Sequence, residues 1–507
     1  MAIIAALAAC AVAPHSPAPD QEMGAEDFKS AIAQLEAGDP QAPETLNARL
    51  DYADFLAGAP GDCRQRLEKA QSQLDIVAGS AVAAVVLPVG RARTAGIAYR
   101  IHAERASCGN DPVSRQRELG EALDAARHAV DLYRDAFDYQ SMAVMQFNAA
   151  VTEHLLGDEA AAVSALEAAI DMDREYGFRD DARDNDDLLQ RWKGDPAGTP
   201  AEDVPRRSAA LSFGWSAGDA DIALEVDVAG IVGDRIVRGK VSEALKRHVR
   251  EDHRDWVVSY SGESAAYDLG HWPDDSRQPQ LMTTLLLKSA LPPFPGVAAT
   301  KKGDFVGVVD PKTLAANLPG AAAARTGDPG SESEGARDLP DYAIQAAKLP
   351  FTDVGIEAVV AQDYYLDTAT WIGAKPDQAV WYEMSAQLLL PGTQFAATYD
   401  MQFAYARPVP CTAAAADRAC VEIVAHAAPE ADDIQAAQKE IARALKLPDG
   451  QSVHYWTATD LRIVTDPAVL MPIVSDTRRY WYIAINGGGQ HDPVVQSERI
   501  VSTVANP

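Results

Sequence analysis

The stretch FAATYDMQFAY, residues 395–405, decides the fold of the C-terminal part of the chain. Its apolar and aromatic residues occupy every second position, and Thr398, Asp400 and Gln402 lie between them. Successive side chains of a β-strand point to opposite faces, so this period of two predicts a strand with one apolar and one polar face. The apolar face is expected to contain Phe395, Ala397, Tyr399, Met401, Phe403 and Tyr405.

The same alternation continues on both sides of this strand. Residues 380–388 alternate in the same way, and the sequence PGTQ between the two runs predicts a turn. Further strand-like runs are CVEIVAHA (420–427), HYWTATDLRIV (454–464), RRYWYIAI (478–485) and PVVQSERIVSTV (493–504). These runs predict an antiparallel meander, whose apolar face has to be covered by curling, by helices or by a ligand.

One amphipathic helix is predicted within this meander, at residues 431–445. Asp432 or Asp433 is expected to cap its N-terminus. Its apolar side is expected to contain Ile434, Ala437, Ile441 and Leu445.

Residues 25–193 have a helical pattern instead, and two of their segments repeat. ALDAARHAVDLYRD begins at Ala122 and AVSALEAAIDMDRE begins at Ala162. The two segments share alanines, an aspartate and an arginine at equivalent positions: Ala122 with Ala162, Ala125 with Ala165, Ala129 with Ala169, Asp131 with Asp171, and Arg134 with Arg174. An internal match of this kind predicts stacked helical repeats.

The segment FNAAVTEHLLGDEAAAVSALEAAIDMD, residues 147–173, resembles a tetratricopeptide repeat. The resemblance makes Gly157 the glycine between two helices, and it places Ala150, Ala162, Leu166 and Ala169 at the small and large packing positions. The aromatic positions of that family hold Gln146 and Glu153 here. Since members of the family bind peptides or proteins, the resemblance implies a protein or peptide partner for this part of the chain.

The first residues are MAIIAALAAC, and the run Leu7-Ala8-Ala9-Cys10 resembles the lipobox of bacterial lipoproteins. In that family the cysteine becomes the mature N-terminus and carries the lipid. The resemblance implies export, lipidation of Cys10 and a place in the cell envelope, and Ala11 after the cysteine favours the outer membrane. Residues 1–24 would then be the signal, the lipobox and a tether.

The other four cysteines are expected to form two disulfides. Cys63 lies in the first turn of a predicted helix, and Cys108 follows a second helical stretch that starts near Pro88. Antiparallel packing of two such helices brings the start of one beside the end of the other. Cys411 and Cys420 flank the loop TAAAADRA between two strands. Paired cysteines favour an oxidising compartment.

Composition excludes several classes of function. Lys and Arg number 45 and Asp and Glu 74, which gives a formal net charge of −29. Such a chain repels phosphate backbones and anionic lipid surfaces, so we expect no nucleic-acid partner. No run approaches the roughly 18 apolar residues that a transmembrane helix needs, so the lipid on Cys10 is the only expected membrane contact.

The fold class predicted from these patterns is α+β with two main domains. RWKGDPAGTPAEDVPRRS, residues 191–208, interrupts the helical pattern, so a linker at 194–207 separates a helical domain (25–193) from a β-rich domain (208–507). A low-complexity insertion is expected near residues 318–340. The terminal hairpins resemble the curved half-barrel sheets of periplasmic lipoprotein carriers, and this resemblance implies a concave sheet.

No catalytic or metal motif is evident in the sequence. Ser264, Asp268 and His271 lie close together but lack G-x-S-x-G, so a polar loop is the better interpretation. His248 and His253 are placed on a helix, about 140° apart around its axis, as surface histidines. We therefore expect no catalytic residues, no metal and no cofactor.

Two main hypotheses for function follow. The first is a non-enzymatic, membrane-anchored lipoprotein, whose helical domain binds a protein partner and whose β domain is a platform or binds an apolar ligand. The alternative is a periplasmic hydrolase assembled from distant residues, in which His271 or His253 would approach a serine and an aspartate. A purely structural envelope protein is a third possibility.

Overall fold

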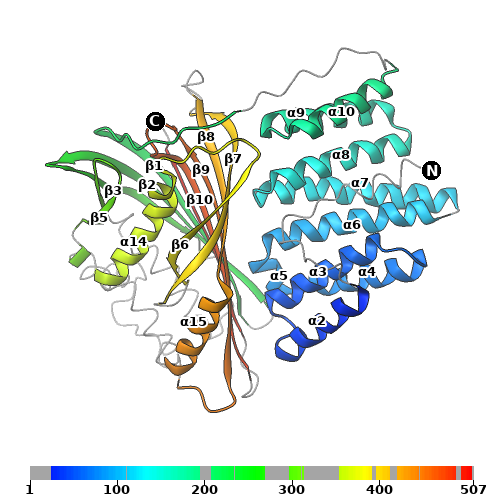
Figure 1. The fold of residues 1–507 in the computed structure, drawn as a ribbon, viewed down its shortest axis with the longest axis horizontal. Helices are drawn as coiled ribbons and strands as arrows, with labels where there is room; N and C mark the ends of the chain where they lie inside the picture. Colours follow the sequence, from blue (N-terminus) through cyan, green and yellow to red (C-terminus); the bar gives the residue numbers. More distant parts are fainter. Residues whose placement is uncertain are drawn as a thin grey trace. The chain divides into compact units, whose positions relative to one another are not determined.

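The computed structural model describes residues 24–109, 111–194, 207–232, 235–268, 296–309, 311–312, 353–390, 395–411, 419–444, 446–486 and 493–504. The chain divides into two units, Met1–Arg206 and Arg207–Pro507. The first is helical and the second is built on a β-sheet, so the structure has the α+β composition that the sequence predicts (Figure 1).

The helical unit consists of consecutive helices that pack against their neighbours in the chain. They are α2 (Ala25–Gly38), α3 (Pro43–Gly58), α4 (Cys63–Ala78), α5 (Ala81–Val86), α6 (Pro88–Cys108), α7 (Pro112–Asp135), α8 (Tyr139–Leu156), α9 (Glu159–Tyr176) and α10 (Arg179–Trp192). Aspartates start several of them: the carboxylates of Asp62, Asp138 and Asp158 accept hydrogen bonds from backbone N–H groups of the first turn. Such caps satisfy donors that the helix itself leaves free.

The junction of α8 and α9 has the geometry expected from the sequence. Gly157 ends α8 with φ of +86°, a left-handed conformation that glycine adopts without steric cost. Ala150 and Leu166 belong to one buried cluster with Ile170. Ala162 and Ala169 are fully buried and allow the two helices to approach closely. The packing positions are those of a helical pair, and membership of the tetratricopeptide family stays a prediction.

Leu166→Ala is expected to destabilise the helical unit by about 2–5 kcal/mol, because Leu166 is fully buried and its removal leaves a cavity between α8 and α9. Urea unfolding followed by far-UV circular dichroism measures the loss. Leu35→Ala, at a partly exposed position of α2, is the control and should cost less than about 1 kcal/mol. Equal effects of the two substitutions would contradict this account of the core.

The second unit contains one antiparallel sheet of 11 strands, within the described residues, in the order β5-β4-β3-β2-β1-β11-β10-β9-β8-β7-β6. The strands are β1 (Gly218–Val232), β2 (Arg235–Asp252), β3 (Asp255–Asp268), β4 (Val297–Thr300), β5 (Phe305–Val308), β6 (Trp381–Leu389), β7 (Ala396–Pro410), β8 (Ala419–Pro429), β9 (Ser452–Thr465), β10 (Pro472–Asn486) and β11 (Val494–Val504). Strands β1 and β11 pair with each other and join the two halves of the meander.

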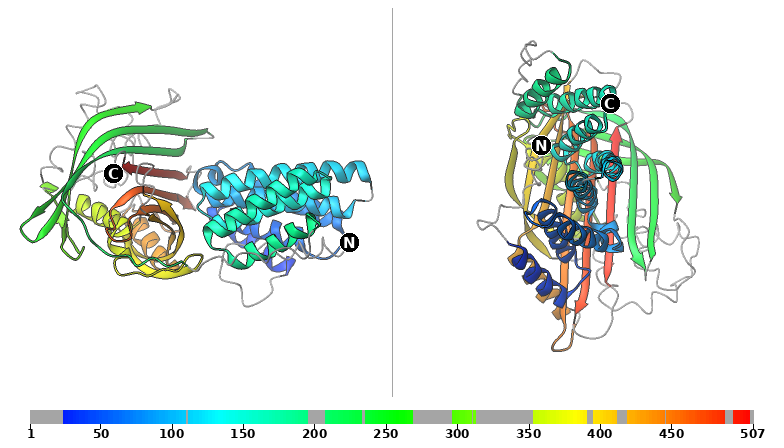
Figure 2. Two further views of the ribbon diagram at one scale, coloured as in Figure 1. Left: turned by 90° about the horizontal axis from the view of Figure 1, so that it is seen from above. Right: turned by 90° about the vertical axis from the view of Figure 1, so that its right-hand side faces the viewer.

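Two helices lie on the same side of this sheet, which we call the concave face (Figure 2). Helix α14 (Asp353–Asp367) contacts both β5 and β6, the two edge strands. One helix can touch both edges only if the sheet curves around it. Helix α15 (Ala431–Ala444) packs on β9 and β7. The opposite side of the sheet is the convex face.

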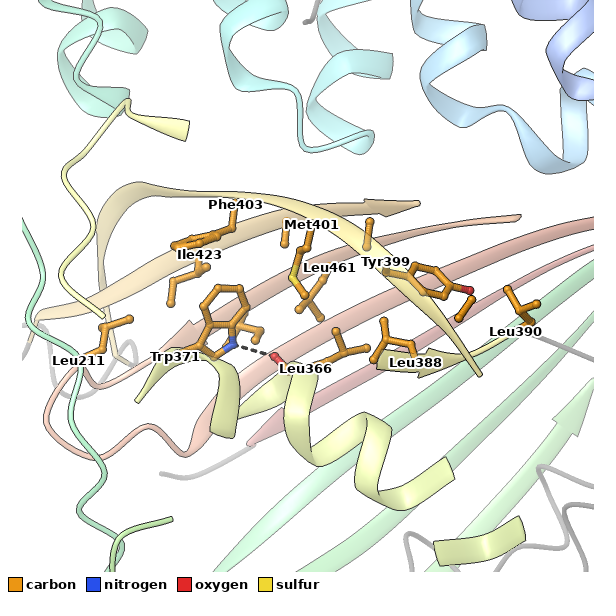
Figure 3. Close-up of a cluster of buried hydrophobic side chains, with 14 of the residues drawn as sticks. Leu211, Leu366, Trp371, Leu388, Leu390, Tyr399, Met401, Phe403, Ile423 and Leu461 are labelled. Atoms are coloured by element: carbon orange, nitrogen blue, oxygen red, sulfur yellow. Dashed lines mark hydrogen bonds between the residues drawn. The ribbon is translucent and has the colours of Figure 1, made fainter. Parts of the chain in front are cut away.

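The largest hydrophobic core fills the concave side of β6–β9 (Figure 3). The predicted apolar faces are confirmed: the core includes Ala397, Tyr399, Met401, Phe403 and Tyr405 of β7, and the alternate residues of β6 pack against it. Trp371, fully buried, lies at its centre and its Nε1 donates to the carbonyl oxygen of Leu366, 2.6 Å away. Core residues also come from α15, namely Ala437 and Ile441.

Two expectations about helices are wrong. Helix α15 begins at Ala431, before both aspartates. Asp432 and Asp433 therefore lie in its first turn, and neither is its N-cap. His248 lies on strand β2, and His253 follows it in the turn to β3. The misleading signal was the spacing of Val237, Val241, Leu245 and Val249. Residues four apart share a face in a strand as well as in a helix.

Candidate functional site

Helix α14 spans the concave side of the sheet and is hydrogen-bonded at both edges. The Tyr364 hydroxyl donates to the carbonyl oxygen of Gly303, 2.7 Å away, in the turn between β4 and β5. The Gln362 side-chain oxygen accepts from the backbone N–H of Leu389 in β6, at 3.2 Å. Both edges of the sheet are thus tied to residues within one turn of the same helix.

Between these edges, two carboxylates of α14 reach the central strand β10. Asp363 forms an ion pair with Arg479, whose guanidinium also lies 3.6 Å from Glu498 of β11. Asp367 accepts a hydrogen bond from the Ser475 hydroxyl at 2.8 Å. Arg479 and Glu498 are almost fully buried. The helix is therefore held over the sheet by polar contacts as well as by apolar packing.

The protonation of Asp367 is linked to this arrangement. Burial and, to a lesser extent, the neighbouring negative charge of Asp363 together raise the pKa of the Asp367 carboxyl to about 7. The hydrogen bond from Ser475 and the positive charge of Arg479 act in the opposite direction. Near neutral pH this carboxyl can therefore gain or lose a proton.

Polar side chains continue along the concave face beside this contact. Gln496 of β11 is 4% exposed. Among the described residues, the Gln496 side-chain nitrogen and Nε of Arg479 have no hydrogen-bond partner. A buried hydrogen-bond donor without an acceptor destabilises the folded state. Neighbouring donors of this kind therefore indicate a binding place for an oxygen atom that accepts hydrogen bonds.

Next to these donors lies an apolar patch made only of strand residues. We call it the concave patch: Ile222, Leu224, Val226, Val228, Val237, Val241, Leu245 and Val504, with Ala220, Ile473 and Ile500 around them. Helices α14 and α15 contribute to the neighbouring cores, but no side chain of a described helix belongs to this patch. The first eight residues of the concave patch are buried, between 2% and 7% exposed, so the patch is an apolar cluster on the inner face beside the donors of Gln496 and Arg479.

The four predicted disulfide cysteines lie in two pairs. Cys63, at the start of α4, pairs with Cys108 at the end of α6, with 6.4 Å between their Cα atoms. Cys411 pairs with Cys420, and their Cα atoms are 4.8 Å apart. Each pair lies within one unit and connects two consecutive long elements, as the sequence predicts.

Several other residues singled out in the sequence lie outside the described residues or in a different element than expected. Cys10, His271 and the predicted insertion at 318–340 lie outside the described residues. Ser264 and Asp268 are on strand β3, not in a loop. Within the part of the chain that the structure describes, no cluster of His, Cys, Asp and Glu could hold a metal. None of its described helices is long and apolar enough to cross a bilayer.

Sequence reasoning missed the polar contact of α14 with β10. Residues 353–367 lie outside every predicted element. Arg479 belongs to a run that predicts a strand, but the sequence pattern does not predict which face of the sheet its side chain is on. A signal was present in β10 and β11, where Ser475, Thr477, Arg479, Gln496 and Glu498 all lie on the concave face. Polar residues at alternating positions on an inner face indicate a functional or specificity-determining feature.

No protein-family model matches the chain, and a search of curated proteins found no matching relative. The function has to be inferred from this geometry.

Asp367→Asn is expected to change how stability depends on pH. In the folded chain the carboxyl keeps its proton up to a pKa of about 7, whereas its ordinary value is 3.8, so wild-type stability falls as pH rises between these values. Asparagine stays neutral and can still accept from Ser475. Relative to the variant, the wild type should lose roughly 2 kcal/mol between about pH 5 and pH 7.5.

Urea unfolding at a series of pH values measures this difference. Asp432→Asn, in the first turn of α15, is the control and should give a curve parallel to the wild type. Parallel curves for Asp367→Asn would show that Asp367 is ionised throughout and would overturn the assignment.

Proposed function

We propose that the chain is an exported, lipid-anchored protein whose β unit binds an apolar ligand on the concave face of its sheet. The observation that carries this proposal is the concave patch, a buried apolar cluster to which no described helix contributes a side chain, beside the buried hydrogen-bond donors of Gln496 and Arg479. An apolar chain against the patch would be stabilised by about 25 cal/mol for each Å² of buried surface.

The donors beside the patch favour a particular class of ligand. Arg479 already lies close to two carboxylates, Asp363 and Glu498, so a further negative charge gains little there. A neutral carbonyl oxygen can accept from Gln496 and from Nε of Arg479 without adding charge. An esterified acyl chain meets both requirements, since its hydrocarbon fits the patch and its carbonyl fits the donors.

Export and anchoring are the second part of the proposal. Two disulfides, one in each unit, are compatible with an oxidising compartment outside the cytoplasm. A chain with a formal charge of −29 is repelled by anionic lipid surfaces, so contact with a membrane would depend on the lipid at Cys10. The anchor would keep the β unit close to a source of acyl chains.

For the helical unit we propose binding of a protein partner. Its consecutive helix pairs offer an extended surface, and Val113 at the start of α7 is 78% exposed although it is apolar. Exposed apolar side chains are a common feature of protein interfaces, although single ones also occur elsewhere.

A direct test uses the full chain with Cys10→Ser, so that no covalent lipid is present. Organic extraction and mass spectrometry of the purified protein should recover an acyl ester in near-stoichiometric amount. In addition, a fluorescent apolar probe should bind the emptied protein. An empty extract together with no binding of the probe would refute the proposal for the β unit.

The concave patch can be tested by a pair of nearly isosteric substitutions. Val226 and Val241 are direct cross-strand partners in the patch, and Val226→Thr with Val241→Thr places two hydroxyls there without changing its shape. The affinity for the probe should fall about tenfold. Val257→Thr, on the convex face of β3, is the control and should leave the affinity unchanged.

Cys10→Ser tests the anchor. In an envelope fraction of a bacterial expression host, the wild-type chain should sediment with membranes and incorporate labelled palmitate, whereas the variant should be released in soluble form and unlabelled. If the wild type incorporates no label, Cys10 is not lipidated and the proposal of a lipid anchor is wrong.

A further inference from the structure

On the convex face of β1–β3, three side chains form a continuous hydrogen-bonded chain. Nδ1 of His248 lies 2.9 Å from the Asp219 carboxylate, and Nε2 of His248 lies 3.0 Å from the Ser261 hydroxyl oxygen. Each distance is within the range expected between a nucleophile, its base and the group that orients the base. The three residues come from three adjacent strands.

Strand register produces this arrangement. His248 of β2 is the direct partner of Asp219 in β1 and of Ser259 in β3, so Ser261 is its diagonal neighbour. Val249 and Val258, one position away, point to the other side and are buried in a core with Tyr364 of α14. The period of two therefore places His248, Asp219 and Ser261 together on the side away from α14.

The hydrogen bonds can be oriented by elementary chemistry. An ionised carboxylate only accepts, so Nδ1 of His248 carries the proton and donates it to Asp219. In the neutral ring Nε2 then accepts from the Ser261 hydroxyl. The contact with His248 also lowers the pKa of the Asp219 carboxyl, which keeps it ionised.

The surroundings of Ser261 suit an attacking group. The Ser261 side chain is exposed, whereas that of His248 is only 19% exposed. A bulge follows immediately, because Leu245 pairs with Gly262 and Ala244 with Ser264, so that Glu263 has no partner in β2. Bulges redirect side chains and are common beside active sites.

The other edge of β3 is also open at this point. Strand β4 pairs with β3 only at residues 255–258, so within the described strands no partner follows Ser261 on that edge. Backbone N–H groups of the bulge and of this open edge are the available donors for an oxyanion. Lys246, the direct cross-strand partner of Ser261, adds a positive charge on the same face.

We propose that Ser261 is a nucleophile and His248 its general base in a hydrolytic site for carboxylic esters, and that Asp219 is a positioning residue. Ser261 Oγ would attack the ester carbonyl carbon while its proton moves to Nε2 of His248. The C–O bond to the alcohol then breaks and the alcohol takes that proton. Water, deprotonated by His248, releases the acid and restores the serine.

The charges around the site bear on which esters it would take. Lys246 and Arg250 lie on the same strand face as His248, on either side of it along β2. Asp219 and Asp221 of β1 lie on this face too, and Lys246 pairs with Asp221 at 3.8 Å. The positive and negative charges are balanced, so we expect no preference for an ester with an anionic substituent. The site lies on the opposite face from the concave patch, so it does not depend on the proposed binding of an apolar ligand.

The test measures hydrolysis of p-nitrophenyl acetate and of the p-nitrophenyl monoester of succinate by the purified full chain. Hydrolysis of both esters should exceed the buffer rate. Ser261→Ala and His248→Gln should each reduce kcat/KM by about 100-fold or more. Ser259→Ala, on the same strand face and directly opposite His248, is the control and should keep wild-type activity.

The role of Asp219 needs a separate readout. Asp219→Asn should lower kcat with little change in KM and should alter the pH profile, because asparagine favours the wrong tautomer of His248. Asp219→Glu should restore part of the activity.

Labelling with a fluorophosphonate, followed by peptide mass spectrometry, provides an independent measurement. The label should be found on Ser261 and should be absent from Ser261→Ala, with circular dichroism confirming that the variants fold. No hydrolysis above the buffer rate in the wild type, or unchanged activity and labelling in Ser261→Ala, would overturn the proposal.

Discussion

The contact of α14 with both edges of the sheet is the constraint on which the β unit depends. Strands β5 and β6 are the first and the last of the 11 strands in the sheet order, and the same helix touches both. The curvature that makes this possible creates a concave side with room for two helices and an apolar patch. Without α14 the two edges would be unpaired and open to other chains. The position of the helix and the curvature of the sheet are therefore coupled.

Polar contacts under α14 do more to specify its position than to stabilise it. Apolar packing by Leu366 and Tyr364 would hold a helix in several registers. The ion pair of Asp363 with Arg479 and the hydrogen bond of Asp367 to Ser475 select one of them. Burying charged groups loses solvation free energy that their mutual attraction only partly offsets. The better explanation for these groups is therefore that they specify one position of the helix. The high pKa of Asp367 reflects that cost.

How much the sequence predicts depends on the range of the interactions involved. The alternation in β6–β11 is a local pattern, and it predicts those strands, the faces of β6 and β7 and the Cys411–Cys420 pair correctly. Strand β2 shows the limit, because its apolar residues four apart fit a helix equally well until pairing with β1 and β3 is known. The position of helix α14 is set by long-range contacts. No local sequence pattern predicts that Asp363 pairs with a residue of β10. The hydrogen bonds of His248 with Asp219 and Ser261 could not be predicted for the same reason, because the pairing register of β1, β2 and β3 brings these residues together.

That register links the two faces of the sheet. Leu245 contributes to the concave patch, and His248, three residues later, faces the convex side. A slip of β2 by one residue would move every side chain to the opposite face, burying His248 and exposing the valines. The free energy that buries Val237, Val241 and Leu245 therefore also holds His248 between Asp219 and Ser261. The convex site is a consequence of the core on the other side, and natural selection could change its polar residues without disturbing that core.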